Sequence, residues 1–222
     1  MKIENIKVCV FDAYGTLFDV NSAAAKCKEK LGSKWEGFAN AWRTTQLEYT
    51  WLRSLMKKHK NFWEITEDSL DHTMEAFKIK KEMRNELLDL YKKLSPYPEV
   101  KECLEELKNK KIIMAILSNG TPELLKGLVE SNNIQNYFDN IFSIESVGVY
   151  KPDSRVYEMP IKQYGCKPEN ICFMSSNTWD ISGGGVFGYN AVWINRFNKA
   201  FDKLGYKPKF VINNLKELLK II

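Results

Sequence analysis

Six short apolar runs alternate with segments of helical periodicity, and this alternation constrains the fold more than any other feature of the chain. The runs are rich in β-branched and aromatic residues, as buried parallel strands are. They span residues 8–11, 112–117, 141–144, 171–174, 191–194 and 210–212. Helical spacing of apolar residues follows at 100–107, 123–129 and 156–164. The pattern predicts an α/β fold, a doubly wound, Rossmann-like parallel sheet with helices on both faces.

Residues 20–95 depart from this alternation. They carry helical patterns without a convincing strand and hold both histidines and four of the six tryptophans. The segment ends at Ser95-Pro96-Tyr97-Pro98, which disfavours helix and suits a hinge. We therefore expect residues 1–19 and 96–222 to form the sheet domain, with residues 20–95 as an inserted helical domain. An insertion directly after the first strand can lie over the carboxyl ends of the strands as a cap.

Composition narrows the class of protein. With 222 residues, 44% hydrophobic and 27% charged, the chain has the balance of an ordinary globular protein. Its net charge of +5 is scattered, so no basic stripe suggests a nucleic-acid partner. Five cysteines without a framework spacing favour a reducing compartment, and no apolar run is long enough for a membrane span or a signal peptide. We expect a cytoplasmic protein with neither a nucleic-acid nor a membrane partner.

Polar side chains follow the predicted strands where each strand ends. Asp12 follows the first strand, Ser118 the second, Lys151 a later junction, and Asp180 the end of the 171–174 strand. Each alone has an ordinary explanation, such as a helix cap, local turn bonding or a surface position. The carboxyl ends of parallel strands meet at one edge of a sheet, where ligands bind. Together the four residues predict a cluster of two carboxylates and one cation at that edge.

These segments resemble the haloacid dehalogenase superfamily, and within it the L-2-haloacid dehalogenases. The similar stretches, in order, are FDAYGTLFDV, WRTTQLEYTWLRSLM, LSNGTPELL, VYKPDSRVYE and SSNTWDISGGGVFGYNAVWINR. The resemblance runs through most of the chain and is weakest in residues 66–95 and after about residue 197. It implies a sheet domain of the superfamily's type with an inserted helical cap.

Two departures from the superfamily's common pattern favour a dehalogenase over a phosphatase. The phosphatases use D-x-D-x-T and a magnesium ion, but the second Asp is Tyr14 here, and Ser176 stands where an acidic metal ligand is usual. Fewer carboxylates make a poorer site for a hard cation, so we expect metal-free and cofactor-free chemistry. The alternatives are a magnesium-dependent phosphatase and a non-catalytic binding protein with the same fold. The complete set of charged and hydroxyl residues argues against the latter.

The resemblance implies roles in a two-step displacement of halide from a 2-haloacid. Asp12 would attack C2 and form an ester, inverting an (S)-2-haloacid to an (R)-2-hydroxyacid. Arg43, with Asn119 and Trp179 beside it, would hold the leaving halide, although from the residues alone Arg43 suits a surface salt bridge. Ser118 and nearby backbone amides would bind the substrate carboxylate.

The remaining implied roles concern the nucleophile, the water and the pocket walls. Lys151 would hold Asp12 as an anion, with Ser175 and Tyr157 as its hydrogen-bonding partners and Thr16 close to Asp12. Asn177 and Asp180 would hold the hydrolytic water, with Asp180 as general base. The apolar walls would be Tyr14, Leu47, Phe62 and Trp179, which could equally be ordinary core. A homodimer is expected from the resemblance, with the tryptophan-rich face of the cap as a possible contact surface.

Other motifs are discounted. Gly183, Gly185 and Gly188 match G-x-G-x-x-G, but the motif normally follows a strand directly, and here 175–180 intervene. We expect these glycines to permit close helix–sheet packing instead. No G-x-S-x-G elbow occurs, and two histidines give poor support for a histidine-based triad.

Overall fold

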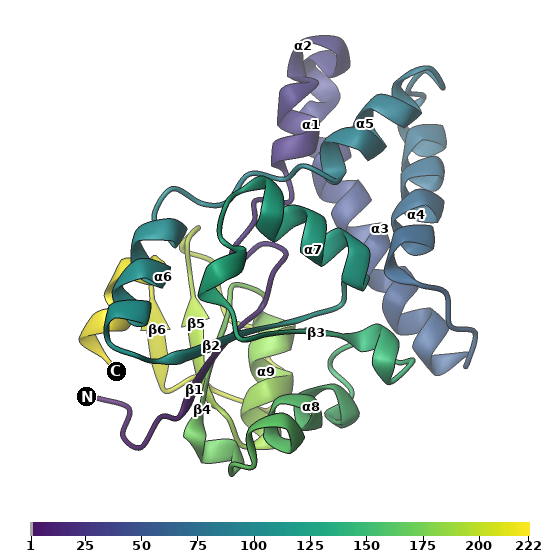
Figure 1. Ribbon diagram of the computed structural model, residues 1–222. Coiled ribbons are helices and arrows are strands. Elements are labelled where there is room, and N and C mark those ends of the chain that lie inside the picture. Colours follow the sequence, from purple (N-terminus) through teal and green to yellow (C-terminus); the bar gives the residue numbers. More distant parts are fainter. Residues whose placement is uncertain (1) are drawn as a thin grey trace.

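A six-stranded parallel sheet forms the centre of the protein, which we describe from a computed structural model covering residues 2–222 (Figure 1). The strands are β1 Val8–Phe11, β2 Ile113–Ser118, β3 Asn140–Ser143, β4 Ile171–Ser175, β5 Asn190–Ile194 and β6 Phe210–Ile212. Their order is β3-β2-β1-β4-β5-β6, and all neighbouring pairs are parallel. The six predicted strands are confirmed to within one residue at each end.

The first strand lies in the middle of the sheet. β1 pairs with β2 on one side, where Val8 aligns with Ile113, and with β4 on the other, where Val8 aligns with Ile171. All four β1 residues are buried, which explains why this strand reads as a continuous apolar run rather than an alternating one. The doubly wound parallel fold is confirmed.

Helices cover both faces of the sheet. Figure 1 shows α6 and α7 on one side and α8 and α9 on the other. The α-helices of this part are α6 Val100–Asn109, α7 Pro122–Ser131, α8 Ser154–Tyr164 and α9 Thr178–Phe187. The 3-10 turns are η2 Gln135–Tyr137, η3 Ile144–Ser146, η4 Pro168–Asn170 and η5 Leu215–Lys220. The start of α7 follows the predicted signal, because the Thr121 hydroxyl accepts from the Leu124 N–H and proline stands in the first turn.

The glycines of α9 pack closely on their surroundings. A Cβ atom on Gly183 would lie 2.6 Å from the Tyr157 hydroxyl oxygen, and one on Gly184 would lie 2.8 Å from the Phe173 ring of β4. Helix α9 therefore approaches the sheet more closely than larger residues would allow. The sheet contact is made by Gly184, which is not one of the three glycines of the motif, whereas the motif glycine Gly183 packs closely against Tyr157 of α8.

Between β1 and α6 the chain forms helices and turns, and its only β-type pairing within the described residues is at the isolated bridges of Phe18 with Tyr14 and Pro96. The helices are α1 Ser22–Lys26, α2 Lys28–Leu31, η1 Gly32–Lys34, α3 Trp35–Leu55, α4 Phe62–Phe77 and α5 Met83–Tyr91. Figure 1 shows this helical segment standing above the sheet. Helix α4 begins with a capping box, in which Asn61 accepts from the Glu64 N–H and Glu64 accepts from the Asn61 N–H. The division into domains at residues 19/20 and 95/96 stays a prediction.

The two chain crossings between the sheet and the helical segment run side by side. Phe18 forms an antiparallel bridge with Pro96. The Asp19 N–H donates to the Ser95 carbonyl at 2.9 Å, and the Tyr97 N–H donates to the Leu17 carbonyl at 3.0 Å. The segment biased against helix thus pairs as a short ribbon with the outgoing chain, which ties the two crossings to each other.

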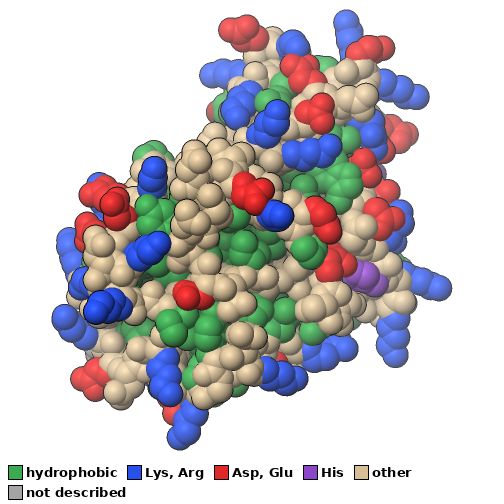
Figure 2. All heavy atoms as spheres, viewed as in Figure 1, with side chains coloured by type: hydrophobic (Ala, Val, Ile, Leu, Met, Phe, Trp, Pro, Cys, Tyr) green, Lys and Arg blue, Asp and Glu red, His purple; other side chains and the backbone are tan. Residues whose placement is uncertain are grey.

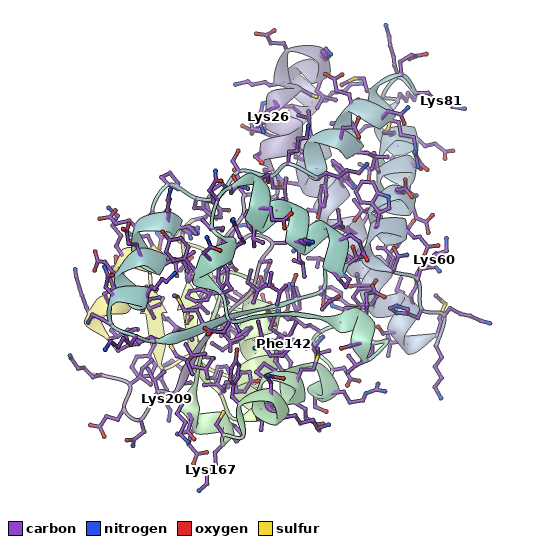
Figure 3. The ribbon with its side chains drawn as sticks, viewed as in Figure 1. Lys26, Lys60, Lys81, Phe142, Lys167 and Lys209 are labelled. Carbon is purple, nitrogen blue, oxygen red and sulfur yellow. The ribbon has the colours of Figure 1, made fainter. Side chains whose placement is uncertain are left out.

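The surface carries its positive charge in dispersed form. Figure 2 shows Lys and Arg side chains spread among acidic ones, and the lysines labelled in Figure 3 come from widely separated elements. No helix within residues 2–222 is long and apolar enough to cross a membrane.

Of the four tryptophans of the helical segment, Trp42 is buried and the other three are half-buried, so a tryptophan-rich contact surface stays a prediction. Trp42 is buried and donates its ring N–H to the Thr66 carbonyl at 3.2 Å. Trp51 packs edge-on against Trp179, with ring centroids 5.5 Å apart. The exposed apolar side chains of α3 are instead Leu52 and Leu55, near its end.

Candidate active site

A buried lysine bridges two carboxylates at the carboxyl edge of the sheet. Lys151 Nζ lies 3.2 Å from Asp12 Oδ1 and 2.9 Å from Asp180 Oδ2. The side chains are 1%, 6% and 0% exposed, respectively. Asp12 directly follows β1, Lys151 lies in the loop before α8, and Asp180 is in the first turn of α9. The predicted cluster of two carboxylates and one cation is therefore present in the structure.

Burial and mutual charge set the ionisation of this cluster. Burial raises the pKa of Asp180 to about 6, and the Asp12 charge adds to that rise, while the Lys151 ammonium opposes it. Burial acts to lower the pKa of Lys151, but the two carboxylates outweigh it and leave that pKa above its ordinary value. The lysine is thus a permanent cation in the site, whereas Asp180 titrates closer to neutrality than an ordinary aspartate.

The two oxygens of Asp12 have different surroundings. Oδ2 accepts hydrogen bonds from Thr16 Oγ1 at 3.1 Å, Ser175 Oγ at 3.3 Å and Asn177 Nδ2 at 2.8 Å. Oδ1 accepts from Lys151 Nζ alone within the described chain. Three donors around Oδ2 fix the carboxylate and can stabilise negative charge there. Oδ1 keeps a lone pair free for attack on a substrate.

Ser175 and Tyr157 contact carboxylates, not the lysine. The family resemblance implies that both are hydrogen-bonding partners of Lys151. Instead Ser175 donates to Asp12, and the Tyr157 hydroxyl donates to Asp180 Oδ1 at 2.7 Å. The reason is that the ammonium is already bound by two anions, and ionised carboxylates are stronger acceptors for the remaining hydroxyl donors.

The end of β2 contributes Ser118 and Asn119 to the same edge. Ser118 is fully buried, and its Oγ accepts from the Gly120 N–H at 3.1 Å, which is the local turn bond that its sequence context favours. Asn119 Oδ1 accepts from the backbone N–H of Lys151 at 3.1 Å and so links this turn to the lysine loop. A Cβ atom at Gly120 would lie 2.9 Å from the Tyr14 hydroxyl oxygen, so glycine here lets the Tyr14 ring pack against the turn.

Arg43 approaches from the helical segment, in the middle of α3. Its Nη1 donates to Gln46 Oε1 at 2.9 Å, and Gln46 is itself held by Thr66 and Tyr91. Sequence reasoning missed Gln46, Thr66 and Tyr91. A signal for Gln46 existed, since it lies three residues after Arg43 and therefore on the same helical face.

A cavity of about 460 Å³ opens between α3 and the carboxyl edge of the sheet. Arg43 and Leu47 line it from α3, and Asn177 and Trp179 line it from the start of α9. Asn177 also donates to Asp12, so it stands between the cavity and the nucleophile candidate. Of the predicted halide-binding residues, Arg43 and Trp179 line the cavity and Asn119 does not. Asp12, Lys151 and Asp180 do not line it either, and the link from the cavity to their cluster is the Asn177 side chain.

Tyr14 and Phe62 lie in an aromatic cluster beside the carboxylate cluster and do not line that cavity. The Tyr14 ring is 5.1 Å from Phe62 and 5.9 Å from Tyr91, between ring centroids. The Tyr14 hydroxyl is buried without a hydrogen-bond partner in the described residues. A role for Tyr14 and Phe62 as walls for the substrate stays a prediction.

Arg196, which follows β5, is a further residue that sequence reasoning did not assign. Its guanidinium forms an ion pair with Glu99, donates to the Thr16 carbonyl at 2.9 Å and lies 3.9 Å from the centroid of the Tyr97 ring. It thereby joins the loop after Asp12 to the returning chain crossing.

Lys151 Nζ lies between the two carboxylates of the site, at the position where a metal ion would have to bind in order to bridge them. Among residues 2–222, no three His, Cys, Asp or Glu side chains group as they do around a metal ion. The position of the second phosphatase aspartate holds Tyr14 in its aromatic cluster.

Comparison with known proteins connects this geometry to a family. A family model of haloacid dehalogenase-like hydrolases matches residues 6–188. The chain is 40% identical to (S)-2-haloacid dehalogenase 1 of Pseudomonas sp. (strain CBS-3), over 99% of this chain and 98% of that protein. It is 43% identical to an (S)-2-haloacid dehalogenase of Pseudomonas fluorescens, covering 97% and 96% of the two chains. The L-2-haloacid dehalogenase of Xanthobacter autotrophicus, solved with chloropropionic acid covalently bound, superposes with a TM-score of 0.90 at 30% identity, covering 97% of each chain.

Proposed function

The chain belongs to the haloacid dehalogenase-like hydrolases, and we propose that it converts short-chain (S)-2-haloacids to (R)-2-hydroxyacids through an ester on Asp12. Hydrolytic dehalogenation of 2-haloacids is the activity of relatives that match nearly the whole chain at 40% identity or more. The observation that supports the proposed mechanism best is the unequal hydrogen bonding of the two Asp12 oxygens.

In the first step, Asp12 Oδ1 donates an electron pair to C2 of the substrate. The carbon–halogen bond breaks, and the halide leaves with the bonding pair toward the Arg43 guanidinium. Lys151 aims the Asp12 carboxylate through its 3.2 Å contact with Oδ1. Back-side attack inverts C2 once, and the product of this step is an ester between Asp12 and the acid, in which only the substrate's own carboxylate keeps its negative charge.

In the second step, water attacks the side-chain carboxyl carbon of Asp12, and Asp180 accepts one of its protons. The negative charge that develops on Oδ2 falls where Thr16, Ser175 and Asn177 already donate. The bond from the carboxyl carbon to Oδ1 then breaks, the leaving alkoxide takes the proton from Asp180, and the free carboxyl group of Asp12 releases its own proton. Overall, one substrate and one water give one hydroxyacid, one halide ion and one proton.

The remaining proposed roles concern substrate binding. Ser118 and neighbouring backbone amides bind the substrate carboxylate. Asn119 and Trp179 complete the halide cradle with Arg43. The proposed apolar walls are Tyr14, Leu47, Phe62 and Trp179.

We propose that residues 20–95 act as a cap over the site and that the protein is a cytoplasmic homodimer. The cap proposal is supported by the paired chain crossings and by the cavity that α3 closes from above. Exposed Leu52 and Leu55 on α3 offer an apolar contact for a second copy. Sedimentation velocity at several concentrations tests the homodimer, which a concentration-independent monomer would exclude.

Neither alternative function is favoured. A magnesium-dependent phosphatase needs carboxylates where Tyr14 and Ser176 stand, and Lys151 already bridges the two carboxylates that are present. A non-catalytic binding protein has no need of a lysine and two aspartates buried together, because burial of unneeded charge is costly.

A single-turnover experiment in H₂¹⁸O, with enzyme in excess, tests the ester mechanism. The product should be almost unlabelled in the first turnover, because its new oxygen comes from Asp12. The label should appear in the peptide that contains 11–16, and in the product after many turnovers. Full labelling of the product in the first turnover would mean direct attack by water on C2 and would exclude Asp12 as nucleophile.

A further inference from the structure

Arg43 keeps an unneutralised charge in the cavity. It is half-buried, and no carboxylate within residues 2–222 lies within 4 Å of it. Arg53, ten residues along the same helix, is different, because its guanidinium bonds Asp68 at 2.9 Å. The hydrogen bond that Arg43 does make is to the neutral amide oxygen of Gln46 at 2.9 Å. A guanidinium held by an amide is oriented while its charge stays available to an anion.

Gln46 is fixed by a chain of hydrogen bonds in which each direction is determined. Gln46 is buried, with only 1% of the residue exposed to solvent. The Thr66 hydroxyl donates its one hydrogen to the Phe62 carbonyl at 2.7 Å, so it can only accept from Gln46, whose Nε2 lies 2.7 Å away. The nitrogen of the amide therefore faces Thr66, and its oxygen must face Arg43.

Tyr91 holds the same amide from a third helix. Its hydroxyl oxygen lies 3.0 Å from Gln46 Nε2 and 3.3 Å from Oε1. The amide is thus clamped between α3, α4 and α5, and its orientation does not depend on solvent. Any other orientation of the Gln46 amide would leave buried polar atoms without hydrogen bonds, which costs free energy. The amide can therefore fix the direction of the flexible Arg43 side chain.

We propose that Gln46 is a positioning residue for halide release, which aims the Arg43 guanidinium at the departing halide without neutralising it. The inference rests on the proposed role of Arg43 in the first step. It assigns the Thr66–Gln46–Arg43 chain a function in breaking the carbon–halogen bond and none in ester hydrolysis. A glutamate at position 46 would hold Arg43 equally close but cancel its charge.

Rapid-quench single-turnover kinetics with (S)-2-chloropropionate and its bromo analogue test this proposal. In Gln46→Met, a substitution of similar length, ester formation should slow by roughly 10- to 100-fold, the range expected for loss of a hydrogen bond to a charged group. Ester hydrolysis should be unchanged. The loss should be greater for chloride than for bromide, because chloride is the poorer leaving group. Gln46→Glu should slow ester formation more than Gln46→Met and weaken product inhibition by added chloride.

Ser69→Ala is the matched control. Ser69 is buried on α4 and donates to the carbonyl of Thr66 in the same helix at 3.0 Å, so its removal also deletes a buried hydrogen bond next to the Thr66–Gln46 contact. Ser69 bonds neither Gln46 nor Arg43. The rate of ester formation in the Ser69→Ala enzyme should therefore stay within about twofold of the rate in the unmodified enzyme. Equal slowing in Ser69→Ala and Gln46→Met would overturn the proposal, because a general loosening of the interface would then explain both.

Two further variants keep the proposal falsifiable if Gln46→Met folds poorly. Thr66→Val keeps the shape of the side chain but removes the group that orients the amide, so it should slow ester formation in part and spare hydrolysis. In an Arg43→Met background, Gln46→Met should add no further loss. An unchanged rate in Gln46→Met beside a slow Arg43→Met overturns the Gln46 inference alone. An unchanged rate in Arg43→Met overturns the proposed halide role and the inference with it.

Discussion

The sheet side and the helical side of the site hold their charges in opposite ways. On the sheet side, Asp12, Lys151 and Asp180 are almost completely buried and bonded to one another. On the helical side, Arg43 is half-buried and bonded to a neutral amide. One side is a closed charge network, and the other presents a single cation with capacity left for an anion.

This difference suits two consecutive chemical steps. A nucleophile and a general base must keep fixed positions through both steps, and the buried network around Lys151 supplies that rigidity. A halide appears only in the first step and must then leave. A cation that is oriented but not paired can stabilise the halide during bond breaking without retaining it as tightly as a buried ion pair would.

Removal of the nucleophile is the strongest test of the sheet side. Asp12→Asn keeps the size of the side chain but should lower the rate of ester formation by at least about 10⁴-fold, because no other group is placed to attack C2. Halide release and mass spectrometry of the intact protein measure this loss. The far-UV circular dichroism spectrum should be unchanged, and substantial halide release by the folded variant would contradict the assignment of Asp12.

Replacement of the cation tests the helical side alone. Arg43→Lys retains a positive charge but loses the planar fork that bonds Gln46 and a halide together, so ester formation should slow by roughly 10- to 100-fold. Ester hydrolysis should change by less than about twofold, since the halide has gone by then. Rapid-quench kinetics separate the two rates. If hydrolysis slowed more than ester formation, the division between the two sides would be wrong.

The pH dependence should separate the steps again. Asp180 must be ionised to accept a proton from water, and its pKa is raised by burial to about 6. In the ester the Asp12 charge is absent, which removes one cause of that rise and places the pKa of Asp180 below its value in the free enzyme. As the pH falls through this lowered pKa, the ester-hydrolysis rate should drop by about tenfold per pH unit, while the ester-formation rate changes much less. Single-turnover profiles that extend to the lowest pH at which the enzyme stays folded measure both, and an ester-hydrolysis rate that is flat through this range would remove Asp180 as the base.

Chelation should have the smallest effect of all. Lys151 supplies the positive charge between the two carboxylates, so steady-state activity in excess EDTA should equal that in untreated enzyme. Added magnesium should restore nothing, because nothing has been lost. A loss of activity in EDTA that magnesium reverses would return the phosphatase-type mechanism to consideration.

The sequence predicts the sheet side of this site better than the helical side. Buried parallel strands are continuous apolar runs, so the residues that follow them can be placed at one edge without knowledge of tertiary contacts. Asp12, Lys151 and Asp180 were grouped on this basis. Gln46, Thr66 and Tyr91 come from three different helices, and their meeting depends on how α3, α4 and α5 pack. Periodicity can place each of them on a helical face but cannot say which faces meet.

The hydrogen-bond partners within the predicted cluster could not be predicted from the sequence either. Ser175 and Tyr157 were expected to bond Lys151 but bond Asp12 and Asp180 instead. The choice of acceptor depends on a competition between charges that are a few ångströms apart. Arg196 is a similar case, since its partners Glu99 and Tyr97 lie about 100 residues earlier in the chain.

The central position of β1 has a consequence for the order in which the protein forms during synthesis. Its sheet partners lie roughly 105 and 163 residues later in the chain. At a synthesis rate of roughly 5–20 residues per second, the second of these partners emerges about 10 to 30 seconds after β1 itself. The whole helical segment is made before the first partner, β2, so until then neither edge of β1 has a partner strand, and the edge that faces β4 lacks one for the entire interval. We therefore expect the strand that precedes the proposed nucleophile to be the first part of the sheet to leave the ribosome and, of the four inner strands, the one that waits longest for both neighbours. This wait makes the nascent chain vulnerable to aggregation through β1.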